Sequence, residues 1–162
     1  TEIRYGKAVE FAGLTGKEKV IDAYCGIGTI SLTLAKHVKK VYGVEVVPQA
    51  IVDAKENAER NHITNAEFVC DDAGHFMTEF VERHEKVDCV MVDPPRKGCS
   101  TEFLERLTTL SPERIVYISC NVATQARDLT YLVEKGYKPL DVQPVDMFPH
   151  TPHIENILLL SK

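Results

Sequence analysis

The sequence predicts an α/β fold in which a mostly parallel β-sheet carries helices on both faces. Two observations support this prediction. Short apolar, β-branched runs alternate along the chain with longer segments of helical periodicity. The apolar runs lack the polar–apolar alternation of a half-exposed strand, as expected for strands that are covered on both faces. This alternation with short connections indicates a doubly wound sheet, formed by one domain over residues 1–162.

The expected elements follow one another in a regular order. The first segment, "TEIRYGKAVEFAG", is expected to form a helix that ends at Gly13. Strands are then expected at 18–25, 40–47, 66–72, 86–95 and 113–120, with helices at 29–38, 49–61, 73–83, 100–109 and 122–135. Two further strands are expected near 137–147 and 155–161. In the usual seven-stranded version of this sheet, the last strand runs antiparallel to the others.

The composition describes a globular chain without a membrane span. Of the 162 residues, 44% are hydrophobic and 27% are charged, and no apolar run approaches the length that a bilayer requires. The five cysteines form no CxxC pair and no zinc-like spacing, which indicates reduced thiols in a cytoplasmic protein. A formal net charge of −5 argues against a large nucleic-acid surface on this segment, although a small basic rim around a site is compatible with it.

The first expected strand ends in the glycine-containing loop "DAYCGIGT". In doubly wound sheets, ligands bind outside the carboxyl ends of the strands, so this loop is a candidate binding site. Gly26 and Gly28 allow the backbone to approach a ligand closely, but they also suit a plain tight turn. Ser31 occupies the position of the third small residue in a nicotinamide-type fingerprint, so this loop alone does not exclude such a cofactor.

Acidic residues end the second and third expected strands. Glu45 can accept hydrogen bonds from both hydroxyls of a ribose, and a carboxylate at Asp71 or Asp72 can meet an adenine amino group. A glycine loop followed by acids on successive strand ends therefore favours a site for an adenosine-containing ligand. The alternative is a tight turn followed by acids that are merely solvated. Because no phosphate-binding lysine accompanies the loop, S-adenosylmethionine fits better than a nucleotide.

The fourth expected strand ends in "DPPRKG", which begins at Asp93. The two prolines fix an extended backbone and cannot donate to a strand ladder, so the chain must leave the sheet here. Asp93 is thereby held at the strand edge. The alternative is a rigid turn without function. A turn of that kind would not require an acidic residue at the end of the preceding strand.

The fifth expected strand ends in "YISCN", where Cys120 lies between a buried strand and a helix. This position holds the thiol at the edge of the sheet, and the positive end of the following helix favours the thiolate. Most cysteines are instead buried and inert, which is expected for Cys70 and Cys89 within strands and for Cys25 behind the glycine loop. Cys99 lies in a loop and is expected to be a surface thiol.

The last loop, "DMFPHTPHIEN", contains two histidines that are candidate metal ligands. The spacing of His150 and His153 suits a helix, but the neighbouring prolines forbid one, so no metal is expected. Glu155 opens the final strand. Because this strand is expected to run antiparallel, Glu155 should meet Asp93 and Cys120 at one edge of the sheet.

A thiol and two carboxylates beside a methyl donor suggest methylation of uracil at carbon 5, which is a poor nucleophile by itself. A thiolate that adds to carbon 6 makes carbon 5 enolate-like, so that carbon 5 can take a methyl group. A base must then remove the carbon 5 proton before the thiolate leaves.

These motifs together resemble those of the RNA uracil-5-methyltransferases. The family's signatures are "D-x-[YF]-C-G-x-G", "DPPR-x-G", "SCN" and "FPHTxHxE", and this chain has DAYCGIG, DPPRKG, SCN and FPHTPHIE in that order. The resemblance implies the Rossmann-like class I fold of S-adenosylmethionine-dependent methyltransferases, with seven strands. It implies Cys120 as nucleophile, Glu155 as general base, and Asp93 at the target base and near the cofactor. The expected cofactor-binding residues are Tyr24, Gly26, Gly28, Thr29, Glu45, Asp72 and Asp93.

The resemblance also implies that this chain is the catalytic domain of a longer enzyme. Family members carry in addition an N-terminal nucleic-acid-binding barrel and a central domain, and the acidic charge of this chain agrees with RNA affinity that resides elsewhere. Some relatives hold an iron–sulfur cluster in an N-terminal cysteine cluster, which is not expected here. The short spacing between Glu45 and Asp93 resembles the branch that acts on ribosomal RNA, so rRNA is favoured over tRNA. Val122 replaces a proline that often follows "SCN" in the family.

Two other functions remain open. An amino-group methyltransferase that acts on adenine also uses an Asp/Asn-Pro-Pro motif, but it requires an aromatic residue where this chain has Arg96, and it does not use Cys120. The other alternative is a non-catalytic module that only binds the cofactor, which applies above all to this domain in isolation.

Overall fold

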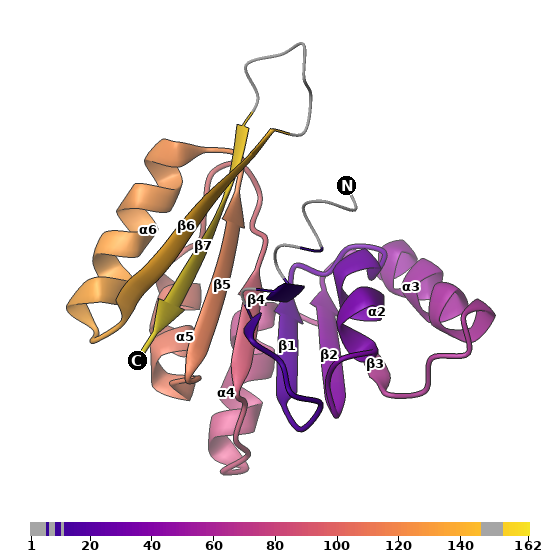
Figure 1. The fold of residues 1–162 in the computed structure, drawn as a ribbon. Coiled ribbons are helices and arrows are strands. Elements are labelled where there is room, and N and C mark those ends of the chain that lie inside the picture. Colours follow the sequence, from indigo (N-terminus) through magenta and orange to yellow (C-terminus); the bar gives the residue numbers. More distant parts are fainter. Residues whose placement is uncertain (1–5, 7–8, 11, 147–153) are drawn as a thin grey trace.

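The computed structural model describes residues 6, 9–10, 12–146 and 154–162, and these form a seven-stranded sheet with helices (Figure 1). The strands lie in the order β3-β2-β1-β4-β5-β7-β6. Along the chain the strands are β1 (Lys19–Ala23), β2 (Lys40–Glu45), β3 (Ala66–Cys70), β4 (Cys89–Val92), β5 (Arg114–Ser119), β6 (Lys138–Asp146) and β7 (Ile154–Ser161). The helices between them are α2 (Thr29–Ala35), α3 (Pro48–Arg60), α4 (Ala73–Glu82), α5 (Thr101–Leu110) and α6 (Val122–Glu134). The predicted succession of strands and helices is confirmed.

Some elements are shorter than the sequence pattern suggests. β4 ends at Val92, whereas a strand to residue 95 was predicted, because Pro94 and Pro95 have no N–H group for the ladder. At the N-terminus, residues 6, 9, 10 and 12 are helical, and Gly13 follows with a φ of 59°, as expected for a glycine that ends a helix. None of the described helices is both long and apolar enough to cross a membrane.

The direction of β7 determines which residues meet at one edge of the sheet. Strands β1 to β5 pair with one another in parallel, so all five end at the same edge. β7 lies antiparallel between β5 and β6, so its first residues lie at that edge as well. The prediction of an antiparallel last strand is therefore confirmed.

Helices cover both faces of the sheet, and successive strand residues enter the two cores alternately. On β1, Ile21 and Ala23 pack with residues of α4, α5 and α6, whereas Val20 packs on the opposite face with residues of α2. In the core on the α4–α6 face, the rings of Phe76 and Phe80 lie 5.0 Å apart in an edge-to-face arrangement. Two covered faces explain why the strands are almost continuously apolar.

Helix α2 lies close to strand β2, and Gly43 makes this approach possible. A Cβ atom added at Gly43 would lie 2.6 Å from Cδ1 of Phe68 and 3.0 Å from the Ser31 hydroxyl oxygen. That hydroxyl donates a 2.6 Å hydrogen bond to the buried carboxylate of Asp22. The small residue at position 31 therefore serves the packing of α2 on the sheet.

Gly43→Ala is expected to lower the free energy of unfolding by about 1–3 kcal/mol, the usual cost of forcing extra volume into a packed core. Thermal and urea unfolding followed by circular dichroism measure the change. Gly6→Ala is a suitable control, because no described atom lies within 4 Å of a Cβ added there. Equal stability of the two variants would contradict the close packing of α2 on β2.

Candidate active site

The chain between β1 and α2 forms a tight loop in which several residues have positive φ. The φ angles of Tyr24, Gly26 and Gly28 are 60°, 56° and 86°. Gly28 is the N-cap of α2, and a Cβ atom there would lie 2.8 Å from the Phe68 ring, so packing restricts this position to glycine. At Gly26 no described atom lies within 4 Å of an added Cβ. The loop therefore packs against the core at Gly28 and presents open backbone at Gly26.

Glu45, the last residue of β2, is oriented by backbone groups on both sides. Its carboxylate accepts hydrogen bonds from the N–H groups of Gly26 and Val47, each at 3.1 Å. Because Gly26 belongs to the glycine loop, this contact holds the acid beside the loop. The structure thus brings together the two features from which the sequence predicts an adenosine site.

A cavity of about 310 Å³ joins the glycine loop to Asp93. It is lined by Asp22, Tyr24, Cys25, Gly26, Ile27, Thr29, Ile30 and Asp93. Tyr24, Gly26, Thr29 and Asp93 are expected cofactor-binding residues, and they follow β1 and β4, which are neighbours in the sheet. Two larger cavities, of about 590 and 650 Å³, lie between α5 and α6 and beside α3 and β3, and neither is lined by an expected site residue.

Asp72 lies at the end of β3, outside the residues that line this cavity. It is the N-cap of α4, and its carboxylate accepts a 2.9 Å hydrogen bond from the His75 N–H. Burial raises the pKa of the Tyr24 hydroxyl, and the neighbouring Cys99 and Asp72 raise it further. The charge of Asp72 therefore acts on the Tyr24 hydroxyl of the glycine loop, while its carboxylate also caps the start of a helix.

The two histidines considered as metal ligands lie outside the described residues. His150 and His153 lie in residues 147–153, which are outside the described residues. Within the described part, Asp71, His75 and Glu79 bring potential ligand atoms within 4.8 Å of one another along α4. His75 forms ion pairs there with both carboxylates, at 2.8 and 3.8 Å, and its pKa is raised, mainly by the hydrogen bond to Asp71. These ion pairs account for the cluster without a metal.

Cys120 lies exposed in the tight turn between β5 and α6. Across this turn, the Ser119 hydroxyl accepts a hydrogen bond from the Asn121 N–H and donates one to the Asn121 carbonyl, both at 3.0 Å. The Asn121 side chain then caps α6 by accepting from the N–H groups of Ala123 and Thr124. The turn therefore leaves the thiol outside, next to the N-terminus of a 13-residue helix.

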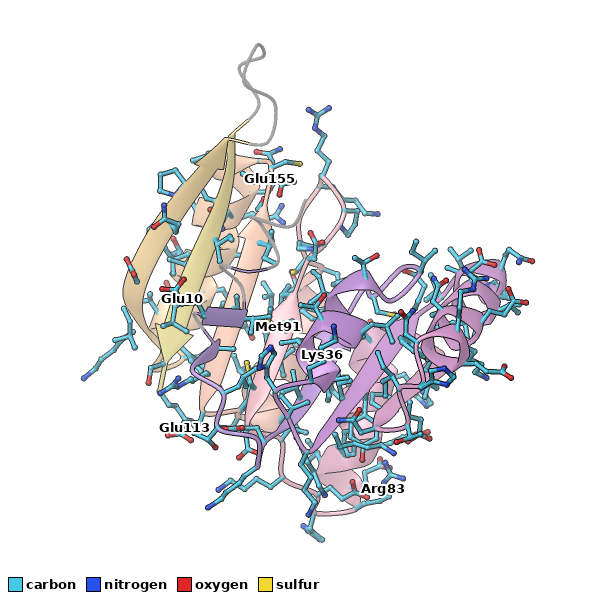
Figure 2. The ribbon with its side chains drawn as sticks, turned by 45° about the vertical axis from the view of Figure 1, so that its right-hand side comes forward. Glu10, Lys36, Arg83, Met91, Glu113 and Glu155 are labelled. Carbon is cyan, nitrogen blue, oxygen red and sulfur yellow. The ribbon has the colours of Figure 1, made fainter. Side chains whose placement is uncertain are left out.

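The two strands that pair with β5 bring Asp93 and Glu155 to the same edge of the sheet as this turn. The last pair of the β5–β7 ladder joins Ser119 to Asn156, so one further step places Cys120 opposite Glu155. Figure 2 shows Glu155 at the end of the sheet where the parallel strands terminate. Asp93 follows β4, which pairs with β5 on its other side. The three expected catalytic residues thus lie at the ends of three adjacent strands.

Sequence reasoning missed two buried polar residues of α6 near this edge, Gln125 and Asp128. Gln125 donates hydrogen bonds to the carbonyls of Tyr117 at 3.4 Å and Asn156 at 3.3 Å, so it joins the helix to both β5 and the start of β7. Together with Leu132, these residues recur at intervals of three and four, the spacing of one buried helix face. The sequence indicates such residues where a polar side chain occupies a position that the helical period assigns to the buried face.

Two cysteines differ from expectation. Cys99 is buried and not a surface thiol, because its loop packs against α6 and places Sγ 3.8 Å from the Tyr117 hydroxyl. Cys70 is exposed and not buried, because it ends β3, which is the edge strand. Cys25 and Cys89 are buried as expected, and burial raises the pKa of the Cys89 thiol to about 12. Cys120 and Cys70 are therefore the two exposed thiols.

Comparison with known proteins identifies relatives of the whole chain. A sequence model of the family described as tRNA (uracil-5-)-methyltransferase matches residues 7–162. An uncharacterized RNA methyltransferase of Bacillus cereus is 54% identical over 162 residues, which are 100% of this chain and 35% of that protein. This chain thus spans about a third of the length of the curated relatives that it matches.

Solved structures show the same fold. The tRNA (uracil-54, C5)-methyltransferase of Pyrococcus abyssi, solved in complex with S-adenosyl-L-homocysteine, is 35% identical with a TM-score of 0.82 over 96% of this chain and 37% of that one. An rRNA methylase of Streptococcus thermophilus, 18% identical with a TM-score of 0.75 over 99% of this chain and 94% of that one, shares the fold. The predicted class I fold of S-adenosylmethionine-dependent methyltransferases is confirmed. With its family model matched over residues 7–162, the chain belongs to the tRNA (uracil-5-)-methyltransferase family, whose methyl donor is S-adenosylmethionine.

Proposed function

We propose that this chain is the catalytic domain of a longer cytoplasmic enzyme that methylates carbon 5 of a uridine in RNA. The observation that carries this proposal is the position of Asp93, Cys120 and Glu155 at the ends of three adjacent strands, with Asp93 also lining the cavity of the glycine loop. Transfer to an adenine amino group needs no nucleophilic side chain, so it leaves the exposed Cys120 without a role. A module that only binds the cofactor needs neither Cys120 nor Glu155.

The residues around the glycine loop fit S-adenosylmethionine. Glu45 would hold the ribose hydroxyls, Asp72 the adenine amino group, and the backbone at Gly26 the part of the cofactor that lies over the loop. Tyr24 and Thr29 line the same cavity, as does Asp93. When bound, the cofactor supplies an electrophilic methyl group.

Cys120 begins the reaction on the uracil ring. Its thiolate bonds to carbon 6, and the electron pair of the 5,6 double bond moves onto carbon 5, which becomes enolate-like and takes the methyl group. Asp93, beside the cavity, holds the target base near the methyl donor. Glu155 then removes the remaining proton from carbon 5. The electrons of that carbon–hydrogen bond re-form the double bond and expel the Cys120 thiolate, which restores the enzyme.

RNA that contains 5-fluorouridine tests the proposal directly. A fluorine atom at carbon 5 cannot be removed as a proton, so the reaction should stop at the methylated adduct on Cys120. Mass spectrometry of the full-length enzyme incubated with this RNA and S-adenosylmethionine should show a covalent complex that includes one added methyl group. Methylated adenine in the product, or an unmodified protein, would contradict the proposal.

Glu45→Ala is expected to weaken binding of S-adenosylhomocysteine by roughly 1.5–3 kcal/mol, the range for losing hydrogen bonds to a charged group. Isothermal titration calorimetry measures the change. Glu67→Ala is the matched control, because Glu67 is an exposed acid of the next strand whose carboxylate forms an ion pair with Lys40 at 3.4 Å. Equal affinity of the Glu45 variant and the parent would remove Glu45 from the site.

The isolated domain is expected to methylate RNA negligibly. A uridine must be unstacked and turned out of the RNA to reach Cys120, which costs a few kcal/mol. RNA contacts must offset that cost, and a domain with a net charge of −5 offers few of them. Transfer of a tritiated methyl group, measured side by side for this domain and the full-length enzyme, is the test. Comparable turnover would show that the domain binds RNA by itself, with Arg96, Lys97 and Arg127 as the first candidates.

Ribosomal RNA is the proposed substrate. The short spacing between Glu45 and Asp93 supports rRNA, whereas the Pyrococcus abyssi relative is by its name a tRNA enzyme. Methylation of unmodified rRNA and tRNA transcripts in one competition assay distinguishes them. Incorporation into tRNA alone would contradict the choice of rRNA and leave the uracil chemistry in place.

A further inference from the structure

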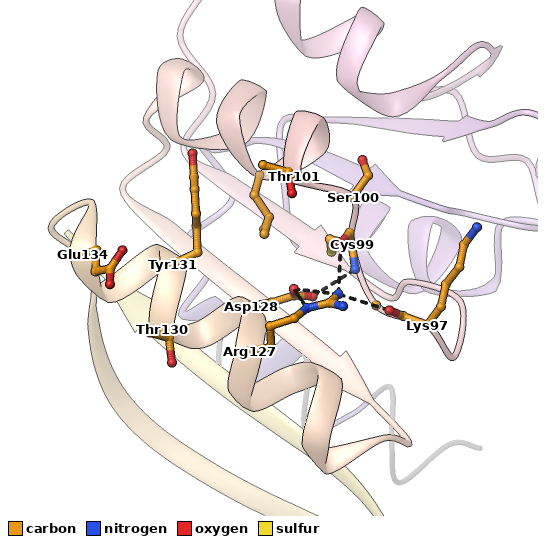
Figure 3. Close-up of a pocket in the computed structure, with 11 residues that line it drawn as sticks. Lys97, Cys99, Ser100, Thr101, Arg127, Asp128, Thr130, Tyr131 and Glu134 are labelled. Atoms are coloured by element: carbon orange, nitrogen blue, oxygen red, sulfur yellow. Dashed lines mark hydrogen bonds and ion pairs between the residues drawn. The ribbon is translucent and has the colours of Figure 1, made fainter.

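One buried carboxylate of α6 lies at the centre of a hydrogen-bond network. Asp128 is 0% exposed, and its Oδ2 accepts hydrogen bonds from the Tyr117 hydroxyl at 2.5 Å and from the Cys99 N–H at 2.9 Å. Its Oδ1 accepts from Nη2 and Nε of Arg127, at 3.1 and 3.2 Å. Figure 3 shows Asp128 between the helix and the loop that contains Cys99. These four residues are called the Asp128 network below.

Arg127 attaches the same loop through its carbonyl groups. Its Nη2 donates to the carbonyls of Lys97 at 3.1 Å and Cys99 at 3.2 Å. Gly98 lies between them with a φ of 82°, and a Cβ atom added there would lie 2.7 Å from that Nη2 and 3.0 Å from Oδ2 of Asp128. The loop backbone is therefore in direct contact with both side chains, and only a glycine fits at its closest point.

A second set of hydrogen bonds joins the beginning of this loop to the beginning of α6. The Asn121 side-chain amide and the Thr124 hydroxyl both donate to the Arg96 carbonyl, each at 3.3 Å. Residues 121, 124, 127 and 128 are spaced by one and two helical turns, so they form one face of α6. This face holds the backbone of the loop from Arg96 to Cys99.

The loop and the helix begin at the two catalytic positions. β4 ends at Val92, so Asp93 lies beyond the strand ladder, and the two prolines after it have no N–H group to attach to the sheet. Asp93 leads directly into this loop, so whatever holds the loop contributes to the position of Asp93. Cys120 comes directly before the N-cap of the helix that holds this loop.

We propose that Asp128 is a positioning residue, which fixes the loop from Arg96 to Cys99 on α6 and so keeps Asp93 and Cys120 at a constant separation. This inference rests on the proposed uracil chemistry. Asp128 does not line the cavity of the glycine loop, so its effect on the reaction passes through the groups that it holds, which are Tyr117, Cys99 and Arg127. Arg127 acts in the same network, because its guanidinium donates both to Asp128 and to the carbonyl groups of the loop.

The charge states in the network match this role. Burial raises the pKa of the Tyr117 hydroxyl, and the adjacent Cys99 and Asp128 raise it further, so Tyr117 remains a hydrogen-bond donor at neutral pH. Burial and Asp128 likewise raise the pKa of the Cys99 thiol, which stays neutral. Arg127 balances the buried charge of Asp128. Asp128→Asn would remove that charge and turn an amide group toward hydrogen-bond donors.

The test uses Asp128→Asn and Tyr117→Phe in the full-length enzyme, with Glu134→Gln as control for an exposed carboxylate of the same helix. Single-turnover methylation at saturating RNA and S-adenosylmethionine, well below the unfolding temperature, should slow by about 10- to 100-fold in Asp128→Asn, because small displacements of reacting groups cost this much. Tyr117→Phe, which keeps the carboxylate and the packing, should slow the same step by a smaller factor. Cofactor affinity and the KM for RNA should stay within about threefold of the parent, since the change concerns the reacting geometry.

Hydrogen–deuterium exchange of residues 96–100 gives a second measurement that needs no reaction. The Cys99 amide should exchange faster in both network variants than in the parent and in Glu134→Gln. If the parent methylates uridine and Asp128→Asn does so at the same rate per folded molecule, the positioning role is wrong and the proposed function stands. If the parent forms no 5-methyluridine, the proposed function fails, and unchanged exchange at Cys99 would separately show that Asp128 does not hold the loop.

Discussion

Cys120→Ala is expected to abolish uridine methylation by the full-length enzyme, with a loss of roughly 10⁴- to 10⁶-fold, as is usual when a covalent nucleophile is removed. Without the sulfur no bond forms to carbon 6, and carbon 5 stays too weak a nucleophile to take the methyl group. A denaturing gel with 5-fluorouridine RNA and S-adenosylmethionine shows the difference. The parent should give a slowly migrating covalent band, and the variant should give none.

Cys70→Ala is the matched control for this experiment. Both cysteines are exposed and lie at the end of a parallel strand: Cys70 is the last residue of β3, and Cys120 follows the last residue of β5. In the sheet, β3 is an edge strand, and β2, β1 and β4 separate it from β5. Cofactor affinity should be unchanged in both variants, because neither residue lines the cavity of the glycine loop. A covalent band with Cys120→Ala, or its loss with Cys70→Ala, would assign the nucleophile to another residue.

Much of the fold was predictable because each strand is covered on both faces. Apolar runs such as 89–92 and 115–118 are therefore strong signals, and the succession of strands and helices follows from their alternation. The ends of the strands were predicted less accurately, because apolar residues continue past the end of β1 at 24–25 and past the end of β2 at 46–47. At β4 the prolines at 94 and 95 set the true end, which was visible in the sequence.

The positions of the candidate site residues at the strand ends were predictable from the sequence, whereas the hydrogen-bond network of α6 behind them was not. Topology alone brings Asp93, Cys120 and Glu155 to adjacent strands, so the sequence pattern and the antiparallel last strand sufficed to predict their convergence. The buried Asp128 escaped notice because its partners come from distant parts of the chain, a loop at Cys99 and a strand at Tyr117. Such pairings depend on how the loop folds back on α6, which local periodicity does not encode.

Glu155→Gln is expected to block the last step of the reaction, whereas Cys120→Ala blocks the first. The thiol is intact, so the bond to carbon 6 should form and carbon 5 should still take the methyl group. A neutral amide does not accept the carbon 5 proton, so elimination of the thiolate should slow by about 10²- to 10⁴-fold, the usual contribution of a general base. The variant should therefore accumulate a methylated, denaturation-resistant complex with ordinary uridine RNA, which the parent resolves too quickly to show.

Glu113→Gln provides the control for the same chemical change at the other end of the sheet, where Glu113 is exposed before the start of β5 (Figure 2). It should behave as the parent does in a gel with S-adenosylmethionine and unmodified RNA. The double variant Cys120→Ala/Glu155→Gln should lose the trapped band, because the complex requires the sulfur. If Glu155→Gln turns over normally, another group removes the proton. If its trapped RNA carries no methyl group, Glu155 acts before methyl transfer, and the assigned order of roles is wrong.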